Sequence, residues 1–282
     1  KRTFNKFSVL YRTNAQSRAF EEALRKLNIP YRIFGGLSFY QRKEIKDLLA
    51  YFRLSANLND EESLKRIINY PKRGIGLTTV NNALTCANEA DVSLWDVIDN
   101  PDQFGFSVNS GTKNKLELFC SLIKNYHSRI DKLNAYELSL EIAKNTGLIR
   151  DLSVDKTPEG IVRFENIQEL LNGIQEFSKN SDEENLISLG DFLIDVALLT
   201  DADKKEDENL NKVSLMTIHA AKGLEFSNVH VVGMEEDLFP SMLSKNSRAD
   251  LEEERRLFYV AVTRAKISLT LSYSVSRFRW GN

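Results

Sequence analysis

Strand-like runs at both ends of the chain flank a long middle region with helical periodicity, and this order limits the folds open to it. Before residue 60, residues 7–13 and 31–34 form β-rich runs with helical spacing between and after them. After residue 210, residues 213–218, 229–234 and 268–274 return to the strand pattern. Strands that alternate with helices favour a parallel sheet. The order predicts one α/β domain that is built from both ends of the chain and split by a helical insertion.

Helices are expected around these strands. Asn14 can cap the first, which covers residues 14–27, and the second covers residues 44–57. The third covers residues 250–266, with acidic residues at its start and basic residues at its end, as the helix dipole favours. Its expected apolar stripe comprises Leu251, Phe258, Ala261 and Ala265. We interpret residues 252–256 of this helix as a solvated, salt-bridged face.

The middle of the chain, from about residue 60 to residue 200, shows helical spacing and few strand patterns. One stretch steps through Leu116, Phe119, Ile123, Tyr126 and Ile130, and another through Phe164, Ile167, Leu171 and Ile174. The charged residues 201–209 are typical of an exposed linker. We therefore expect a first α/β segment over residues 1–70, a helical inserted domain over 71–210 and a second α/β segment over 211–282.

Composition is that of a globular chain. The 282 residues are 28% charged and 42% hydrophobic, which excludes wholesale disorder and allows one large or two ordinary domains. No run of about 18 apolar residues and no secretory signal pattern occur, so we expect no membrane association. Cys86 and Cys120 form neither a disulfide framework nor a metal set, which suits a reducing cytoplasm. Because the chain starts at Lys1 without Met and soon enters a strand-like run, we expect a longer parent protein.

The segment TIHAAKGLEF, at residues 217–226, leads from a buried strand into a polar loop. It begins at the carboxyl end of that strand, where open α/β sheets bind ligands. His219 and Lys222 can meet phosphates, and the carboxylate of Glu225 suits ribose hydroxyls. Gly223 lies within the same loop. For a single loop of this composition, an ordinary strand–loop connection with solvated charges is the more common outcome.

A second segment, LEEERRLFYVAVTRA at residues 251–265, contains Arg264 near the end of the predicted helix and off its apolar stripe. A planar guanidinium on a rigid element can stabilise the charge that develops on a transferring γ-phosphate. For a lone arginine, an ordinary helix-end position that suits the helix dipole is the more common alternative.

Together, in this order and about 40 residues apart, the two segments resemble motifs V and VI of the superfamily 1 DNA helicases of the UvrD/PcrA/Rep group. Further segments resemble the same family: VLYRTNAQSR at residues 9–18, YRIFGGLSFYQRKEIKDLLAYFRL at 31–54, PKRGIG at 71–76 and GMEEDLFP at 233–240. The resemblance covers nearly the whole chain and is weakest between about residues 100 and 157.

The resemblance implies a RecA-like parallel-sheet motor domain, called 2A, that is interrupted by a mostly α-helical inserted domain, called 2B. It implies an ATP-dependent DNA helicase that moves 3′ to 5′ along single-stranded DNA and unwinds the duplex. ATP and Mg²⁺ are the implied cofactors. The implied partners are single-stranded and duplex DNA, the protein's own first motor domain, called 1A, and repair or replication proteins.

For the nucleotide, the resemblance assigns Arg264 to the γ-phosphate of ATP and Glu225 to the ribose. Lys222 and Gly223, in the same motif as Glu225, complete the implied nucleotide-binding set.

The resemblance also assigns DNA contacts to two groups of residues. The single-strand group comprises Thr217, His219, Arg12 and Asn14. The duplex group comprises Lys72, Arg73, Gly74, Ile75, Gly76, Thr78 and Thr79, with backbone amides of the glycine-containing turn facing phosphates. Apart from the resemblance, PKRGIG can equally be a turn into a helix that Thr78 caps. Because the net charge of the chain is −2, any DNA contacts would be local.

The sequence has no phosphate cradle of its own. No G-x-x-x-x-G-K-[ST] motif occurs, and no strand ends in an acidic pair that could hold Mg²⁺. In the family both elements belong to domain 1A. We therefore expect the chain alone to be inactive, and we predict no metal ligand within it.

Two other functions stay open. A helicase–nuclease subunit of the RecB or AddA kind shares these motifs, although PKRGIG and VLYRTNAQSR favour the simpler helicase. The chain by itself can also be a non-catalytic DNA- or protein-binding module. Phe39, Tyr40 and Tyr51 could stack on bases, but their helical context favours core packing.

Overall fold

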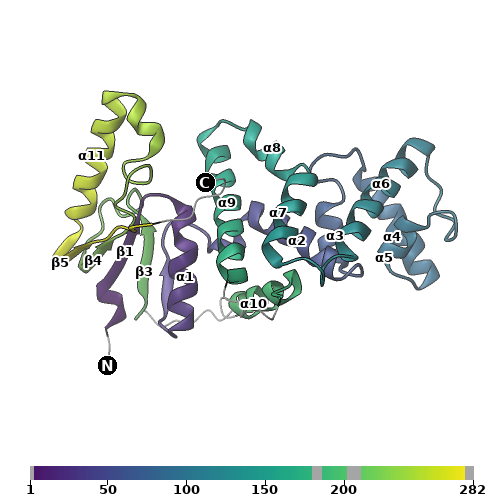
Figure 1. Ribbon diagram of the computed structural model, residues 1–282, viewed down its shortest axis with the longest axis horizontal. Coiled ribbons are helices and arrows are strands. Elements are labelled where there is room, and N and C mark those ends of the chain that lie inside the picture. The colour runs from purple at the N-terminus through teal and green to yellow at the C-terminus, as the bar shows by residue number, and fades with distance from the viewer. Residues whose placement is uncertain (1–2, 180–185, 202–210, 277–282) are drawn as a thin grey trace. The chain divides into compact units, whose positions relative to one another are not determined.

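The computed structural model describes residues 3–179, 186–201 and 211–276, and the chain forms two compact units (Figure 1). The sheet unit comprises Lys1–Arg42 and Leu199–Asn282, and the helical unit comprises Lys43–Leu198. Both ends of the chain therefore contribute to one unit. The helical unit starts earlier than the inserted domain expected from residue 71, and the bounds of the two inferred domains stay predictions.

Five parallel strands form the sheet in the order β2-β3-β1-β4-β5. They are β1 (Phe7–Tyr11), β2 (Tyr31–Ile33), β3 (Val213–Thr217), β4 (Phe226–Val231) and β5 (Ala265–Leu271). β1 lies at the centre, where Leu10 is in register with Met216 of β3 on one side and with Val231 of β4 on the other. The α/β class and the parallel sheet are confirmed, and the arrangement is consistent with a RecA-like domain.

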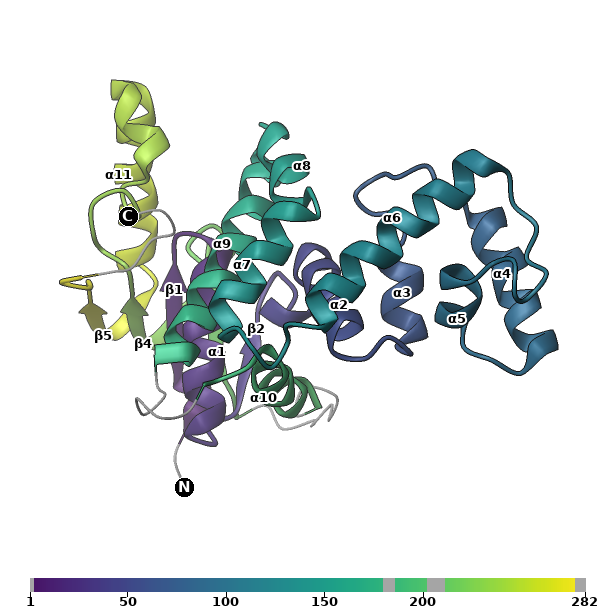
Figure 2. The ribbon, with the colours of Figure 1, turned by 45° about the vertical axis from the view of Figure 1, so that its right-hand side comes forward.

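Helices cover both faces of this sheet (Figure 2). The sheet unit contains α1 (Ser17–Lys26), α11 (Arg248–Val262) and the short 3-10 helices η1 (Phe4–Lys6), η2 (Asn14–Gln16), η3 (Phe39–Gln41) and η5 (Met242–Asn246). Successive residues of a strand point to opposite faces, and Leu10 and Tyr11 accordingly enter two different apolar clusters. α11 packs on the Leu10 cluster through Leu257, and α1 packs on the Tyr11 cluster through Phe20.

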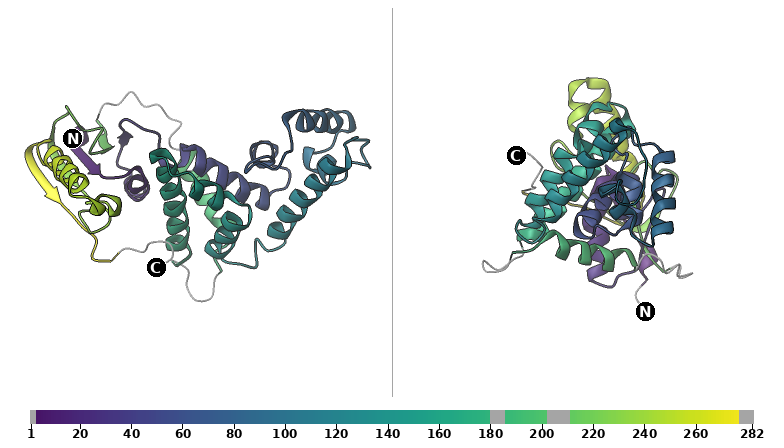
Figure 3. Two further views of the ribbon diagram at one scale, coloured as in Figure 1. Left: turned by 90° about the horizontal axis from the view of Figure 1, so that it is seen from above. Right: turned by 90° about the vertical axis from the view of Figure 1, so that its right-hand side faces the viewer.

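The described part of the helical unit has helices as its only regular elements (Figure 3). They are α2 (Lys43–Ala56), α3 (Glu61–Ile67), α4 (Leu77–Ala90), α5 (Leu94–Asp99), α6 (Ser110–His127), α7 (Ala135–Asn145), α8 (Leu148–Val154), α9 (Pro158–Lys179) and α10 (Leu189–Asp201). α2 packs against α3, α6, α7 and α9, with Leu48 and Phe52 fully buried. The predicted helical periodicity is confirmed, whereas the predicted linker lies outside the described residues from residue 202 onwards. Within the described ranges, none of the helices has the length and apolar character needed to span a bilayer.

The structure corrects the start of the first predicted helix. Asn14 does not cap it, because Asn14 lies within η2 and α1 starts only at Ser17. Gln16 fixes this part of the chain. Its Oε1 accepts the backbone N–H groups of Arg12 and Thr13, both at 2.9 Å.

The structure also corrects the end of the helix that contains the second motif. α11 ends at Val262 rather than at residue 266, because Ala265 already pairs with Phe226 in the sheet. Of the expected apolar stripe, Ala261 is buried whereas Leu251 is exposed. The residues that follow Val262 therefore belong to a turn and a strand.

Phe39, Tyr40 and Tyr51 pack in the core, and none of them is more than 4% exposed. Tyr40 donates a hydrogen bond to Glu22 at 2.8 Å, and burial raises the pKa of Tyr51 to about 12. Core packing is therefore confirmed for these rings, because so little of their surface is left for stacking on a base.

Leu10→Ala should destabilise the sheet unit by about 2–5 kcal/mol, because it removes a fully buried side chain from the central strand and leaves a cavity. Hydrogen exchange of the β3 and β4 amides measures the free energy of opening of this unit. Leu27→Ala, at a position that is 68% exposed, is the matched control and should change that free energy by less than about 0.5 kcal/mol. Equal effects of the two substitutions would contradict the core position of Leu10.

Candidate functional site

The predicted site residues of the sheet unit fall at two opposite edges of the sheet. In a parallel sheet, all strands start at one edge and end at the other. Arg12 follows β1 and His219 follows β3, so both lie at the carboxyl edge. Glu225 directly precedes β4 and Arg264 directly precedes β5, so both lie at the amino edge. The sequence grouped His219 and Glu225 in one loop at the carboxyl edge, and the structure separates them across the sheet.

At the carboxyl edge, Arg12 forms a two-pronged ion pair with Glu254 of α11. Arg12 Nε lies 3.0 and 3.2 Å from the two carboxylate oxygens, and Nη2 lies 2.7 Å from Oε1. Glu254 is only 7% exposed, and it also accepts the N–H of Ser241 at 3.3 Å. The interpretation of residues 252–256 as a solvated face is therefore wrong for Glu254. It is confirmed for the other four, which form exposed ion pairs along the helix.

Thr217 and Asn14 lie at the same edge as Arg12. Thr217 is the last residue of β3, and its Oγ1 accepts the N–H of Ala220 at 3.2 Å. Asn14 is exposed on η2. These two residues and Arg12 therefore lie at the same end of the strands, and their assignment to single-stranded DNA stays a prediction.

His219 is exposed to solvent. Protein atoms around its ring nevertheless lower the pKa of the imidazole. Burial is the main cause, the positive charge of Arg12 is the second, and the carboxylate of Glu254 opposes both. The shift favours the uncharged ring over the imidazolium ion. His219 is thus suited to hydrogen bonding rather than to pairing with a phosphate as a cation.

Gln16 and Gly233 also shape this edge, although neither was predicted to be a site residue. Gly233 follows β4 with a φ of +72°, which favours glycine. A Cβ at this position would overlap the side chain of Gln16. The close approach of the two segments therefore depends on glycine, and the only sequence signal for it is that Gly233 opens the string GMEEDLFP.

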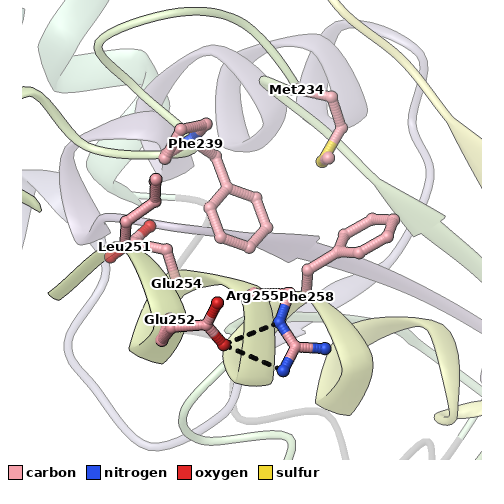
Figure 4. A pocket seen from close by; sticks show the side chains of 8 residues that line it. Met234, Phe239, Leu251, Glu252, Glu254, Arg255 and Phe258 are labelled. Carbon is pink, nitrogen blue, oxygen red and sulfur yellow. Dashed lines mark hydrogen bonds and ion pairs between the residues drawn. The ribbon is translucent and has the colours of Figure 1, made fainter. Parts of the chain in front are cut away.

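A pocket lies beside Glu254, between α11 and the segment that follows β4 (Figure 4). Its apolar lining comprises Met234, Phe239, Pro240, Leu251 and Phe258. Glu252 and Arg255 form an ion pair at 2.9 Å at its wall. The rings of Phe239 and Phe258 meet edge to face, with centroids 6.2 Å apart. The GMEEDLFP segment is thus a packing partner of α11.

At the amino edge, Arg264 lies in the turn between α11 and β5 and ties this turn to the start of β4. Its Nε donates to Val260 O at 3.0 Å, Nη1 to Leu224 O at 3.0 Å and Nη2 to Thr263 Oγ1 at 2.9 Å. The backbone of Arg264 also accepts the N–H of Phe226 at 2.9 Å. A guanidinium has five N–H donors, so these bonds leave two for another acceptor.

Glu225, Lys222 and Gly223 lie on the segment that reaches this turn. Glu225 is exposed and pairs with Lys266 at 3.1 Å. Lys222 is exposed in the turn before it. Gly223 has a φ of +87°, and a Cβ there would meet nothing within 4 Å, so backbone conformation rather than space favours glycine. The structure therefore brings Glu225 and Arg264 onto adjacent backbone segments.

The third candidate site is the PKRGIG turn of the helical unit, where Arg73 points into the fold. Its Nη1 donates to three backbone carbonyls, those of Ile67, Tyr70 and Pro71, at 3.0 to 3.2 Å. Its Nη2 donates to the Tyr51 hydroxyl at 2.6 Å. The guanidinium is thus engaged within the protein, whereas Lys72 is exposed.

The turn leads directly into α4, whose N-cap position is Gly76 and which has no side-chain cap. Thr78 and Thr79 lie within the first turn of the helix, so the alternative in which Thr78 caps it is wrong. The first backbone bond of α4 runs from Val80 N to Gly76 O at 3.2 Å. The N–H groups before Val80 therefore have no partner within the helix.

No cluster of three His, Cys, Asp or Glu side chains suited to a metal ion occurs in the described ranges. Cys86 and Cys120 are free, and burial raises the pKa of Cys120 to about 12. Burial therefore disfavours the reactive thiolate form of Cys120.

The chain belongs to the UvrD-like helicase C-terminal domain family, which matches residues 1–276. The family resemblance drawn from the motifs is confirmed.

Curated relatives match along nearly the whole chain. The ATP-dependent DNA helicase PcrA of Staphylococcus aureus (strain MRSA252) is 42% identical over 284 residues, which is 99% of this chain. PcrA of Bacillus subtilis (strain 168) is 42% identical over 286 residues, and DNA helicase II of Salmonella typhimurium (strain LT2) is 40% identical over 274 residues, covering 100% and 97% of this chain. The chain spans 38% of the length of each of these relatives.

Glu254→Gln should lower the free energy of unfolding of the sheet unit by about 1–3 kcal/mol, because it weakens a mostly buried ion pair and leaves Arg12 without its counter-charge. Amide exchange in β1 and α11 measures the change. Glu252→Gln, on the same helix in an exposed pair, should have an effect below about 1 kcal/mol. A Glu254 variant as stable as the Glu252 variant would show that the buried pair contributes nothing.

The pKa of His219, followed by NMR, should lie below 6.5. Arg12→Met should raise it and Glu254→Gln should lower it further, because these substitutions remove a positive and a negative neighbour. Since the folded state disfavours the protonated ring, the contribution of His219 to stability is fully present above pH 6.5 and is lost as the pH falls towards the lowered pKa. His219→Gln should remove this pH dependence, and an unchanged profile would exclude His219 as its source.

Proposed function

We propose that the chain is the C-terminal part of an ATP-dependent DNA helicase that moves 3′ to 5′ along single-stranded DNA and unwinds the duplex ahead of it. In this proposal, residues 1–70 and 211–282, which contribute all five strands of the sheet, form the RecA-like motor domain 2A, and residues 71–210 form the inserted domain 2B. Family membership supports the proposal, as do relatives named as DNA helicases. The activity of the whole protein is part of the proposal.

The main support for a motor function is that the two groups of candidate residues lie at opposite edges of a single sheet. Arg264 and Glu225 lie together at the amino edge, and Arg12 and His219 lie at the carboxyl edge. A motor that couples nucleotide hydrolysis to movement on DNA needs both sites on one rigid element. The sheet provides that element.

The residues at the amino edge fit one half of a nucleotide site. Arg264 is fixed by three hydrogen bonds and keeps two N–H donors for an oxygen of the γ-phosphate. A guanidinium held in this way stabilises the negative charge that develops during phosphoryl transfer. Glu225 is exposed and can accept hydrogen bonds from ribose hydroxyls if it releases Lys266. Lys222 adds positive charge on the same segment.

The rest of the nucleotide site would come from domain 1A. ATP would supply the phosphoryl group that is transferred to water, and Mg²⁺ held by domain 1A would neutralise part of its charge. The chain has no G-x-x-x-x-G-K-[ST] sequence to hold the phosphates. The role of this chain is therefore to supply Arg264 and Glu225 to a site that its partner domain completes. The chain alone should not hydrolyse ATP.

At the carboxyl edge, Thr217, His219 and Asn14 would contact phosphates of the single strand. Arg12 would contribute less directly. Glu254 already holds two of its nitrogens, so its charge is largely compensated. In the helical unit, Lys72 and the uncapped amides of Gly76 and Thr78 would meet duplex phosphates.

The proposal includes its setting. A DNA helicase of this kind acts in the cytoplasm alongside repair or replication proteins, and the free cysteines of the chain are compatible with a reducing compartment. A subunit of the RecB or AddA kind is the alternative helicase. Identity of 40–42% to simple helicases along nearly the whole chain favours the simpler enzyme.

Arg264→Ala in the full-length helicase should lower kcat for DNA-stimulated ATP hydrolysis by roughly 10³-fold or more, the scale of arginine-finger losses, with a smaller effect on ATP binding. Arg256→Ala, which removes an exposed arginine of α11 paired with Glu253, is the control and should leave kcat within about twofold. Steady-state hydrolysis and equilibrium nucleotide binding measure the two effects. Unchanged turnover in Arg264→Ala would exclude Arg264 from the chemistry.

A further inference from the structure

One side chain holds the backbone of the PKRGIG turn. Asn69 Oδ1 accepts the N–H groups of Arg73, Gly74 and Ile75 at 2.9, 2.9 and 3.2 Å. Three successive N–H groups that converge on one oxygen form a concave arrangement that can also bind an anion. The oxygen of Asn69 is therefore either a permanent part of the turn or a substitute for a phosphate oxygen.

The other contacts of the turn favour a permanent role. Asn69 accepts the N–H groups of the turn. Arg73 donates hydrogen bonds to the carbonyls of Ile67, Tyr70 and Pro71, which precede the turn. The side chain of Ile75 is 1% exposed, which anchors the backbone at the far end. The N–H groups of Arg73, Gly74 and Ile75 and the carbonyls that Arg73 contacts thus have partners within the chain itself.

This bonding changes which amides are available to DNA. The N–H groups of Gly74 and Ile75, which the family resemblance assigns to duplex phosphates, already have Asn69 as their acceptor. The N–H of Gly76 and those of the first turn of α4 follow immediately, and α4 has no side-chain cap. The shape of the turn therefore decides where these next amides point.

We propose that Asn69 is a positioning residue that presets the turn at residues 73–76 for the duplex contact. The inference rests on the proposed function of the helical unit. In it, the N–H groups of Gly74 and Ile75 bind Asn69 and stabilise the turn instead of contacting DNA phosphates. Gly74 has a φ of +74°, as a turn of this shape demands, and Lys115 Nζ lies 3.3 Å from its carbonyl oxygen. Because the turn already has its bound geometry, DNA binding does not incur the entropy cost of ordering it.

Amide exchange in the free chain tests the positioning without DNA. Asn69→Ala should speed the exchange of the Arg73, Gly74 and Ile75 amides by about tenfold or more, because the substitution removes their common acceptor. Asn69→Asp keeps an acceptor oxygen in the same place and should retain the protection. Asn82→Ala, an exposed asparagine on α4, should change nothing in the turn. Unchanged exchange in Asn69→Ala would overturn the proposal.

Binding of a blunt 18-base-pair duplex at low salt tests the consequence. Asn69→Ala should weaken binding by about fivefold to tenfold. This factor corresponds to the net free energy of about one hydrogen bond, which would be needed to order the turn when DNA binds. Asn82→Ala should bind like the unchanged chain. Tighter binding by Asn69→Ala would overturn the proposal, because it would show that Asn69 occupies the place of a phosphate. If the unchanged chain binds no duplex, the proposed duplex contact fails, while the exchange experiment still decides whether Asn69 holds the turn.

Discussion

The sheet unit depends on the pairing of β1 with two strands that lie about 200 residues later in the chain. Leu10 joins both neighbours, through Met216 and Val231, so the five-stranded sheet cannot be complete before β1 has met the strands that follow the helical unit in the chain. The entropy cost of such closure grows slowly, by about 0.6 kcal/mol for each doubling of a flexible loop. A compact insertion is therefore compatible with a stable sheet. The fully buried side chains of β1 and its neighbours supply the compensating apolar burial.

α11 joins the two edges that this sheet creates. It has 15 residues, which corresponds to about 22 Å. Glu254 in its first half holds Arg12 at the carboxyl edge, and the turn after its last residue places Arg264 at the amino edge. Between these points, Leu257 and Ala261 are buried against the sheet. A displacement of α11 would therefore disturb the residues of both edges together.

Much of this fold could be predicted from the sequence, because the relevant signals are local. Residues 7–13, 31–34 and 213–218 have the apolar and β-branched composition of strands, and the middle region has helical spacing. The family was equally predictable, because long ordered motifs carry more information than single residues. The resemblance assigns Arg12, Asn14, Thr217 and His219 to one DNA strand, and the structure places all four at one end of the strands.

The predictions that failed depended on partners distant in sequence. Glu254 resembles its neighbours Glu252 and Glu253, and only the position of Arg12 across the fold makes it a buried residue. The end of α11 depends on the pairing of Ala265 with Phe226 rather than on helix propensity. Asn69 gave no signal at all, because its three hydrogen bonds exist only once the turn has folded over it. Each case is a tertiary contact that overrides a local preference.

The positive charge of Arg73 affects the rate at which the helical unit encounters a charged partner. Its guanidinium is held by carbonyl and hydroxyl oxygens and lies over the rings of Tyr51 and Phe119, and no carboxylate pairs with it among the described residues. Neutral dipoles stabilise a cation without cancelling its charge. A full positive charge therefore remains beneath the turn, where its field reaches outward over about 8 Å at physiological ionic strength. This charge would raise the rate of encounter with a polyanion, and added salt would reduce that gain, although Arg73 itself stays within the fold.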